Sequence, residues 1–495
     1  MKSEFSKQQC PTGIKGLDEI LQGGLPRNRI YLLQGEPGAG KTTLALQFLL
    51  EGAKKGETGL YITLSETRDE LLGVAESHGW SLDAITILEL SAIEQQLGDT
   101  KENTFFHPSE LELDKTAKIL TDEVERVKPV RVAIDSLSEF RLLAEVPLRY
   151  RRQMLKLKQY FAGRQSTVLL LDDRSAEASD LHIQSIAHGV MTLSRLPVTY
   201  GVQRRQIQIN KLRGVKFREG VHDYSIEKGG LHIFPHLIAA DHHREFAQDP
   251  VSSGIPGFDK LLGGGLDRGT SNLFIGPAGA GKSTLGVQHA IYAASRGEKS
   301  VIFAFDENSK ILRTRTAALG MPMDDHLESG LIQVQQVDPA ELSPGQFANI
   351  VIKAVEENDA RVIVIDSLNG YLNAMPNEKF LSLQLHELLT YLSQQGVVSI
   401  MTVAQHGMVG PMRSPIDVTY LADTVILLRF FETEGRVRKA LSVIKKRSGG
   451  HEDTIRELSM DKSGIHIGEP LEDFHGILTG VPDFHGKPEA MMKET

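Results

Sequence analysis

Short apolar runs alternate with longer amphipathic stretches along most of the chain. In the first half the apolar runs read RIYLLQG, GLYITLSE, VRVAIDSL and STVLLLDD; in the second half they read NLFIGP, SVIFAFDE, RVIVIDSL and VVSIMTVAQ. Nearly every position in these runs is apolar, which is typical of strands buried on both faces of a parallel sheet. Four later runs, VMTLSRL, RQIQINKLRG, TVILLRFF and RKALSVIKKR, predict additional strands. We therefore expect an α/β fold in which helices cover both faces of a mainly parallel sheet.

A long internal repeat divides the chain in two. The segment TGIKGLDEILQGGLPRNRIYLLQGEPGAGKTTLALQF, from Thr12, recurs as SGIPGFDKLLGGGLDRGTSNLFIGPAGAGKSTLGVQH, from Ser253, and matching positions lie 241 residues apart. Such an offset has the length of a domain and far exceeds the period of a solenoid repeat. The 495 residues also exceed what a single hydrophobic core usually supports. We predict tandem domains at 1–240 and 241–495, the second with a short C-terminal tail, and a boundary in the polar stretch HLIAADHHREFAQDP.

Each half carries a glycine-rich turn between a predicted strand and a predicted helix. GEPGAGKT begins at Gly35 and GPAGAGKS begins at Gly276, and both match the P-loop pattern GxxxxGK[ST]. Glycines let successive backbone N–H groups converge on phosphate oxygens, and the following helix presents its N-terminus to the anion. A plain glycine-rich turn is the alternative, which two matches at one offset disfavour. The predicted ATP-binding residues are Gly35, Gly38, Ala39, Gly40, Lys41, Thr42 and Thr43, and Gly276, Gly279, Ala280, Gly281, Lys282, Ser283 and Thr284.

A carboxylate that ends an apolar strand is expected beside each P-loop. VRVAIDS supplies Asp135 and RVIVIDS supplies Asp366. With the hydroxyls of Thr42 and Ser283, these acids would hold Mg²⁺ and its waters. The alternative is an acid that caps the next helix, a common role at strand ends. These features together predict two tandem RecA-like P-loop domains that bind ATP and Mg²⁺.

Acidic residues also follow the strand after each P-loop helix. This strand ends in Ser65-Glu66 in the first half and in Asp306-Glu307 in the second half. Strand ends in an open parallel sheet face the ligand crevice, so Glu66, Asp306 and Glu307 are candidate catalytic bases for the attacking nucleophile. A solvated acid at the start of a loop is the alternative. Asp306 and Glu307 would point in different directions on an extended strand, and the sequence does not choose between them.

Basic residues end a late strand in each half. The patterns are Lys211-Leu212-Arg213 and Lys445-Lys446-Arg447. Residues two apart share a face of a strand, so each pattern presents two cations to one target. A phosphoryl group on a neighbouring subunit would suit them, in the manner of an arginine finger. A solvated strand edge is the alternative.

Composition and charge narrow the function classes. The formal net charge is −9, and a nucleic-acid-binding domain usually shows a basic face, so DNA or RNA is not expected as the main partner. Cys10 is the single cysteine, which fits a reducing cytoplasm. The start MKSEFSKQQC lacks the apolar region of a signal peptide, and no stretch approaches 18 consecutive apolar residues. We expect a cytoplasmic protein without a membrane span.

The duplicated P-loop units, the IDS strands and the Lys-x-Arg strand ends together resemble the KaiC family of circadian-clock ATPases. The resemblance runs from about Thr12 to about Phe484. It implies a homohexamer of two stacked rings with ATP between subunits, ATP hydrolysis in the first domain, and Ser/Thr autokinase with autophosphatase activity in the second. The contacts that it implies to a neighbour's ATP are Lys211, Leu212, Arg213, Lys445, Lys446, Arg447 and His451; it also implies that Ser77 contacts nucleotide.

Several positions depart from the family pattern. The family has paired glutamates where this chain has Ser65-Glu66 and Asp306-Glu307, so Asp306 occupies the place of the kinase-domain base and a Mg²⁺-side acid. The adjacent Ser and Thr phosphoacceptors of the family correspond to Thr419 and Tyr420. The short tail disfavours a partner like KaiA, whereas a partner like KaiB or another signalling protein remains compatible. The resemblance implies a clock-type or signalling switch. The alternatives are a RecA- or helicase-type DNA-dependent ATPase and an ATPase without kinase activity.

Overall fold

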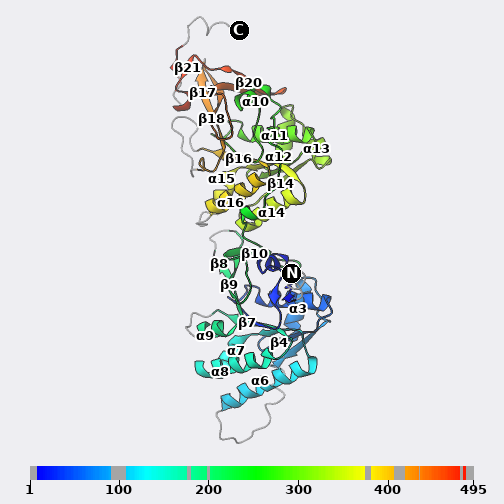
Figure 1. Ribbon diagram of the computed structural model, residues 1–495. Coiled ribbons are helices and arrows are strands. Elements are labelled where there is room, and N and C mark those ends of the chain that lie inside the picture. The colour runs from blue at the N-terminus through cyan, green and yellow to red at the C-terminus, as the bar shows by residue number, and fades with distance from the viewer. Residues whose placement is uncertain are drawn as a thin grey trace. The chain divides into compact units, whose positions relative to one another are not determined.

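The computed structural model describes residues 8–90, 108–174, 180–197, 201–373, 381–405, 418–433, 435–479 and 483–485. The chain divides into two compact units, Met1–His236 and Leu237–Thr495, called the first and second unit below. Figure 1 shows one large sheet with flanking helices in each of them. None of the described helices is long and apolar enough to cross a membrane.

The first unit is built on a nine-stranded mixed sheet. Six neighbouring strands, from β8 to β5, run parallel, and β9, β10 and β11 form an antiparallel extension beside β8. In spatial order the strands are β11 (Gly230–Phe234), β10 (Val221–Glu227), β9 (Arg204–Leu212), β8 (Gly189–Leu196), β3 (Ile30–Gly35), β7 (Thr167–Asp173), β6 (Arg131–Asp135), β4 (Gly59–Thr63) and β5 (Ile85–Glu89). A separate two-stranded pair joins β1 (Gln9–Cys10) to β2 (Leu25–Pro26).

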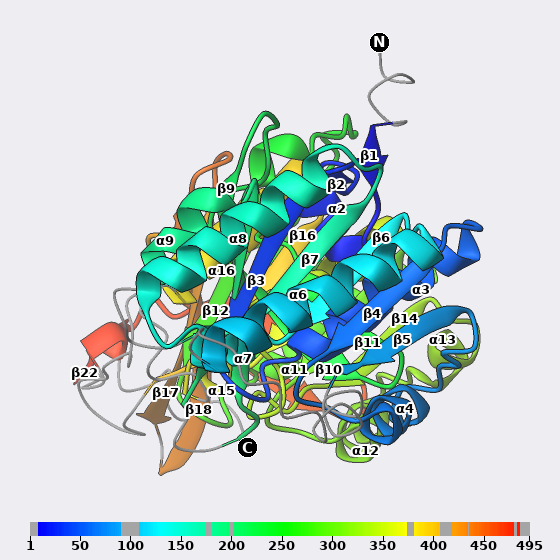
Figure 2. The same cartoon turned by 90° about the horizontal axis from the view of Figure 1, so that it is seen from below.

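Helices cover both faces of this sheet, as Figure 2 shows for α6 and α8 on one face. Side chains alternate between the faces: Tyr31 and Leu33 pack with the buried residues of α3, whereas Ile30 and Leu32 pack with those of α6 to α8. Both faces are therefore apolar, as the unbroken apolar runs predict. The helices are α2 (Lys15–Ile20), α3 (Lys41–Lys54), α4 (Arg68–Ser77), α6 (Pro108–Val127), α7 (Leu137–Ala144), α8 (Pro147–Ala162) and α9 (Asp180–Ile186).

The second unit repeats this plan. Its main sheet has the order β14 (Ile332–Gln336), β13 (Lys299–Ala304), β15 (Ala360–Asp366), β16 (Val398–Ala404), β12 (Ser271–Gly276), β17 (Thr424–Thr433), β18 (Arg436–Lys446), β19 (Arg456–Asp461) and β20 (Gly464–Pro470). Its helices are η1 (Ala239–Asp241), α10 (Pro256–Leu261), α11 (Lys282–Ser295), α12 (Ser309–Ala318), α13 (Asp324–Glu328), α14 (Pro344–Glu356), α15 (Leu368–Asn373), α16 (Leu381–Gln394) and η2 (Ile477–Thr479). A short pair, β21 (Phe474–His475) and β22 (Asp483–Phe484), stands apart from the main sheet.

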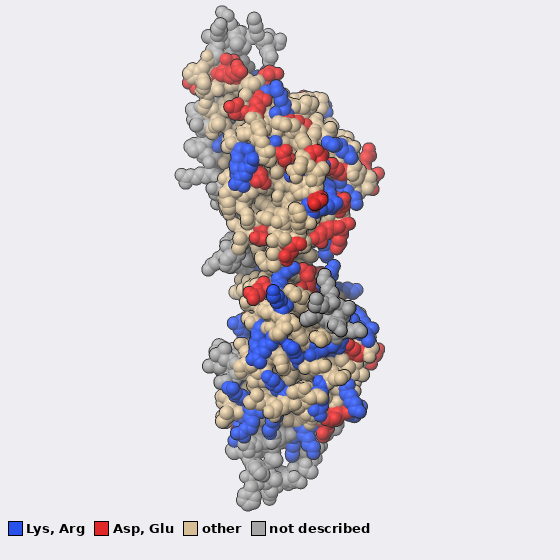
Figure 3. Space-filling view, in the orientation of Figure 1, with Lys and Arg blue, Asp and Glu red and all other residues tan. Residues whose placement is uncertain are grey.

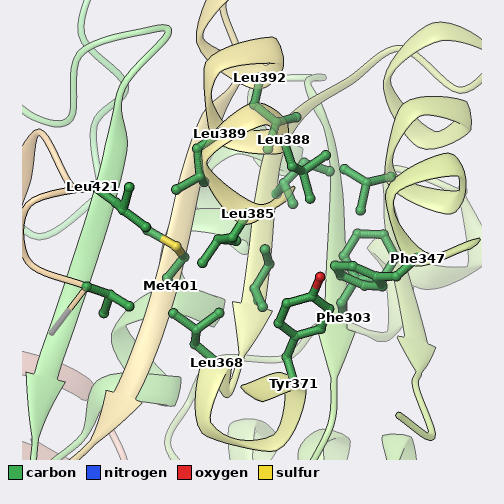
Figure 4. Packing of buried hydrophobic residues seen from close by; sticks show 14 of the residues in the cluster. Phe303, Phe347, Leu368, Tyr371, Leu385, Leu388, Leu389, Leu392, Met401 and Leu421 are labelled. Atoms are coloured by element: carbon green, nitrogen blue, oxygen red, sulfur yellow. The ribbon is translucent and has the colours of Figure 1, made fainter. Parts of the chain in front are cut away.

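The core on one face of the second sheet is dense and partly aromatic. Figure 4 shows leucines of α16 against Met401 of β16, and the rings of Phe303, Phe347 and Tyr371 beside one another. The Phe303 and Phe347 ring centroids lie 5.3 Å apart in an edge-to-face arrangement, which is favourable for aromatic pairs. The opposite face packs on α11. The predicted α/β fold with two tandem, mainly parallel sheets is confirmed, and the four later runs are strands β8, β9, β17 and β18.

A buried histidine ties the antiparallel extension of the first unit together. His222 lies on β10; its Nδ1 accepts a hydrogen bond from the backbone N–H of His236 at 2.8 Å, and its Nε2 lies 3.2 Å from the carbonyl oxygen of Arg218. This pattern requires a neutral ring whose Nε2–H donates. Burial lowers the pKa of His222 to about 4, and the charges facing it belong to His236, Arg218 and Asp223.

We predict that the first unit loses stability as the pH falls from about 6.5, the ordinary pKa of unfolded histidine, towards 4. The unfolded state then binds a proton that the folded state rejects, at a cost of about 1.4 kcal/mol per pH unit. Trp80 is the single tryptophan, so its fluorescence during urea unfolding reports on this unit. His222→Asn, which keeps an acceptor in place of Nδ1, should flatten this part of the pH dependence. Equal slopes for both proteins would contradict the assignment.

Candidate functional site

The first P-loop connects β3 to α3 at the carboxyl edge of the parallel strands. Gly40, at the N-terminus of α3, has a φ of 93°, and a Cβ there would lie 2.7 Å from Cδ1 of Ile226. The hydroxyl of Tyr224 on β10 donates to the carbonyl oxygen of Ala39 at 2.6 Å. The neighbouring strands thus fix a tight turn that only glycine fits, and its N–H groups lie where a helix N-terminus attracts anions.

The lysine of this loop is buried and already paired. The Nζ of Lys41 donates to the carbonyl oxygens of Gly35 at 3.0 Å and Glu36 at 3.2 Å. It also lies 2.7 Å from Oδ1 of Asp173, whose side chain is 45% exposed at the end of β7. A bound phosphate would therefore compete with Asp173 for the ammonium group.

Two carboxylates meet beside the first P-loop. The hydroxyl oxygen of Thr42 lies 3.1 Å from Oδ2 of Asp135 and 3.4 Å from Oε1 of Glu66, and the hydroxyl of Tyr61 donates to the same Asp135 oxygen at 2.6 Å. Burial, followed by the nearby Asp135 charge, raises the pKa of Glu66 to about 7. Burial also raises the pKa of Asp135. Glu66 directly precedes Thr67, whose side chain caps the N-terminus of α4.

This group of oxygen atoms fits a magnesium ion that also binds ATP. Oε2 of Glu66 is buried and has no hydrogen-bond partner within the described ranges. No cluster of three or more His, Cys, Asp or Glu side chains among these ranges could hold a metal by itself. Mg²⁺ usually takes one or two protein oxygens and completes its shell with water and phosphate, which Thr42 and Asp135 would allow.

The second P-loop has the same backbone shape and a different lysine environment. Gly281 has a φ of 109° at the N-terminus of α11. The Nζ of Lys282 donates to the carbonyl oxygen of Pro277 at 2.7 Å, and burial lowers the pKa of Lys282 to about 8. Ala404 pairs with Gly276 as Asp173 pairs with Gly35, so the second unit has a methyl group where the first has a carboxylate.

The strand-end acids of the second unit are held by hydroxyl groups. Oδ1 of Asp366 accepts hydrogen bonds from Ser283, at 2.8 Å, and from Thr402. The hydroxyl of Ser367 donates to Oδ2 of Asp306. Burial raises the pKa of Asp366. The hydroxyl of Ser283 and the carboxylates of Asp366 and Asp306 are therefore suitable in kind and place for Mg²⁺.

Glu307 lies in an ion pair. Its two carboxylate oxygens accept from Nε and Nη2 of Arg315 at 3.1 Å and 2.8 Å. Nη1 of Arg315 donates to the hydroxyl of Thr284, on the P-loop helix α11, at 2.8 Å. Asp306 and Glu307 thus have different partners, which the sequence did not reveal.

The predicted cations of the first unit lie at the sheet edge opposite its P-loop. Because β9 runs antiparallel to β8, Lys211 faces Val190 near the start of β8, whereas the loop follows the end of β3. The Nζ of Lys211 donates to the carbonyl oxygens of Gln184 and Ala187, and Nη2 of Arg213 donates to that of Ser185. Both therefore point towards α9, while Leu212 between them is buried in the core.

The second unit repeats this placement. The Nζ of Lys445 donates to the carbonyl oxygens of Thr419 at 3.1 Å and Ala422 at 2.7 Å, and Nη2 of Arg447 donates to that of Tyr420 at 3.1 Å. Lys446 points the other way, where its Nζ lies 3.1 Å from Oδ2 of Asp267. Thr419 and Tyr420 therefore lie beside two cations and at the edge away from their own P-loop.

Two remaining candidates lie on the surface. The hydroxyl of Ser77, at the end of α4, donates to the carbonyl oxygen of Val74 at 2.7 Å. His451 is half-buried in the segment between β18 and β19. Neither touches the P-loop residues of its own unit in any hydrogen bond of the described chain.

Comparison with known proteins places this geometry in one family. The family model described as "ATPase: KaiC" matches residues 10–238 and again residues 251–472, once over each P-loop unit. The chain belongs to the KaiC family of ATPases. Curated relatives named "Circadian clock oscillator protein KaiC" are 25% identical over 489 residues in Parasynechococcus marenigrum and 24% identical over 490 in Thermostichus vulcanus. A "Circadian clock protein KaiC3" of Synechocystis sp. is 25% identical over 498 residues.

These alignments extend over nearly the full length of both chains. They cover 97% of this chain in all three cases, and 94%, 93% and 96% of the respective relatives. The recognition of the KaiC family from the repeated P-loops is thus confirmed, and with it a nucleotide-binding, ATP-hydrolysing protein.

Sequence reasoning missed several residues at this KaiC-family site. Asp173 ends an apolar run that was recognised as a strand, but its contact with Lys41 depends on strand order. Nη1 of Arg195, on β8, donates to the carbonyl oxygen of Pro37 in the first P-loop at 2.7 Å. The repeat itself points to Arg315, because the matching position of the first unit, 241 residues earlier, is the uncharged Val74. Comparing the two halves for charge differences would have found it.

We predict that Asp173→Asn tightens ATP binding by the first unit. Lys41 would no longer exchange a carboxylate for phosphate, and partly exposed pairs contribute roughly 0.2–1 kcal/mol, which corresponds to about 1.4- to fivefold in affinity. Titration with a fluorescent ATP analogue in a Lys282→Ala background measures this site alone. The matched control, Ala404→Asp in a Lys41→Ala background, should weaken binding by the second unit. Weaker binding by Asp173→Asn would show that Asp173 assists the nucleotide.

Proposed function

We propose that this KaiC-family protein hydrolyses ATP with Mg²⁺ in its first unit and phosphorylates its own Thr419 in the second, within a homohexamer that has nucleotide between subunits. The observation that supports this most is the separation of each unit's cations from its own P-loop. Lys211 and Arg213 lie at the amino edge of the first sheet, and Lys445 and Arg447 lie at that of the second. Cations so placed do not reach phosphate at the P-loop of their own unit, which supports nucleotide held between copies.

In the first unit the residues divide the work of hydrolysis. The loop amides and Lys41 bind and orient the β- and γ-phosphates, in place of the Asp173 contact. Thr42 and Asp135 would hold Mg²⁺, which would neutralise charge on the phosphate oxygens. Glu66 accepts a proton from the attacking water, since its free Oε2 lies in the site and its raised pKa suits a general base near neutrality.

The neighbouring subunit supplies the remaining charge. Lys211, near the end of β9, and Arg213, directly after it, both point towards α9, so both would approach the same phosphate chain from the adjacent copy. ATP that binds across such an interface stabilises the assembly by linkage, because it binds the ring more tightly than the separated subunit. A six-membered ring follows the family resemblance.

The second unit is arranged for transfer to a hydroxyl group. Thr419 lies beside Lys445 and close to Arg447, at the edge that would meet a neighbour's ATP. Asp306 of that neighbour would take the proton of the Thr419 hydroxyl as the threonine oxygen bonds the γ-phosphorus and ADP leaves. Tyr420, 57% exposed, is the second candidate acceptor at this edge. Autophosphorylation would then alter the charge between Lys445 and the interface.

Such a reversible modification on a ring ATPase fits a signalling or clock-type switch, and the relatives named above are circadian clock proteins. A KaiB-like or other signalling protein is the expected partner. Lys and Arg are spread over the visible face of the first unit in Figure 3. Because such a surface could bind nucleic acid, dependence of the ATPase on DNA should be measured directly. Stimulation of phosphate release by single-stranded DNA, lost with added salt, would favour that alternative.

We predict that Glu66→Gln lowers phosphate release on the order of 10²–10⁴-fold in a Lys282→Ala background, while ATP remains bound. The amide keeps the size of the side chain and its contact with Thr42 but cannot accept the proton. Single-turnover phosphate release measures the chemical step, and size-exclusion chromatography checks that assembly persists. Unchanged release would mean that Glu66 is not the base.

We predict that incubation with ATP and Mg²⁺ places phosphate on Thr419, detectable by phosphopeptide mass spectrometry. Thr419→Val should abolish the modified peptide, whereas the matched variant Tyr420→Phe should retain it. Asp306→Asn should also abolish it while phosphate release by the first unit continues. Phosphate on Tyr420 alone would reassign the acceptor, and no modification at either residue would leave an ATPase without kinase activity.

A further inference from the structure

The two candidate bases of the repeat have opposite surroundings. Glu66 has no cation within hydrogen-bond distance in the described chain, and its Oε2 is without a partner. Glu307, the matching residue 241 positions later, has both oxygens bound by the guanidinium of Arg315. Each acid stands at the start of a capped helix: Thr67 caps α4 and Asn308 caps α12. The backbone frame is therefore shared, and the difference lies in the side chains.

One residue of that frame accounts for the difference. Arg315 and Val74 occupy matching positions on α12 and α4. Val74 packs against the hydrophobic core of the first unit, whereas Arg315 extends to Glu307 and Thr284. The first unit also has a threonine, Thr43, at the position of Thr284. The side chain at this helix position therefore distinguishes the paired acid from the unpaired one.

We propose that Arg315 is a positioning residue that withdraws Glu307 from catalysis, leaving Asp306 as the only working base of the second unit and so suppressing hydrolysis there. This inference rests on the proposed function. It also decides which of the two adjacent acids acts as the base: Glu307 is bound by Arg315, and Asp306 remains to accept the proton.

The geometry makes this withdrawal effective. A planar guanidinium that binds both carboxylate oxygens is among the strongest side-chain pairs, and it fixes the carboxylate plane as well as its position. The pair is only partly exposed, with 29% of the Arg315 side chain and 22% of the Glu307 side chain accessible. The third bond, from Nη1 to Thr284, anchors the guanidinium to the P-loop helix, so it cannot swing away with Glu307. A water aligned on ATP would meet no free oxygen of Glu307.

Slow hydrolysis in the second unit would preserve ATP for transfer to a threonine. A hydroxyl group and water compete for the same γ-phosphate, and a site that transfers to the threonine of a neighbouring copy must hold ATP until that residue arrives. Asp306 is one methylene shorter than the glutamate of the first unit at the neighbouring position, and its carboxylate is already held by Ser367. Pairing Glu307 with Arg315 removes the longer acid that would activate water.

The test exchanges the residue types at the two matching helix positions, 315 and 74. Arg315→Val is made in a Glu66→Gln background, which silences hydrolysis by the first unit while keeping its nucleotide. We expect kcat for phosphate release to rise on the order of tenfold or more, since a freed general base contributes at least that much, with a smaller change in KM for ATP. The reciprocal variant Val74→Arg, in an otherwise unchanged chain, should lower first-unit kcat by a similar factor.

Two further variants trace the effect to Glu307. Arg315→Val combined with Glu307→Gln should return kcat to the level of the background protein. Arg315→Lys, which keeps the charge but cannot bind both carboxylate oxygens and Thr284 at once, should give a kcat between those of Arg315→Val and the background protein. An unchanged or lower kcat in Arg315→Val with nucleotide still bound would overturn the proposal, as would a gain that survives Glu307→Gln. If Glu66→Gln itself leaves phosphate release intact, the proposed function fails instead, so the two failures are distinguishable.

Discussion

The need to satisfy charge under a glycine-rich turn governs both sites. Lys41 and Lys282 are 8% and 6% exposed, and an ammonium group so buried must have oxygen partners. The loop carbonyls provide some of them, and phosphate is the partner that the turn is shaped to admit. The surrounding acids carry negative charge that burial also disfavours, and burial raises the pKa of Glu66, Asp135 and Asp366. A nucleotide with magnesium would satisfy both sets of charges at once.

Duplication has preserved the frame and changed the partners. Both sheets have nine strands in matching order, and both loops follow a central strand. Asp173 is matched by Ala404, and Val74 by Arg315, so one unit neutralises its lysine and the other neutralises its acid. These exchanges involve single side chains on elements whose backbone need not move. They are the kind of change by which two copies of one fold acquire different rates.

Much of the fold was readable in the sequence because parallel strands buried on both faces leave long apolar runs, and because the repeat marks the same elements twice. The positions of the P-loops and of the strand-end acids Asp135 and Asp366 could also be predicted from the sequence pattern. What the sequence could not give are contacts set by strand order, such as Lys41 with Asp173, and by the direction of a side chain, such as Lys446, which turns away from Lys445 and Arg447. The different partners of Asp306 and Glu307 likewise depend on the position of Arg315 in space.

The bond from Tyr224 to the carbonyl oxygen of Ala39 links the loop to the strand pair β10 and β9. Lys211 lies near the end of β9 and Arg213 directly follows it, so the P-loop at one edge of the sheet is linked to the cations at the opposite edge. A shift of the loop must either break this bond or drag the strand pair with it. The first P-loop and the cations at the opposite edge of its sheet are therefore mechanically coupled through one side-chain hydrogen bond and a strand pair.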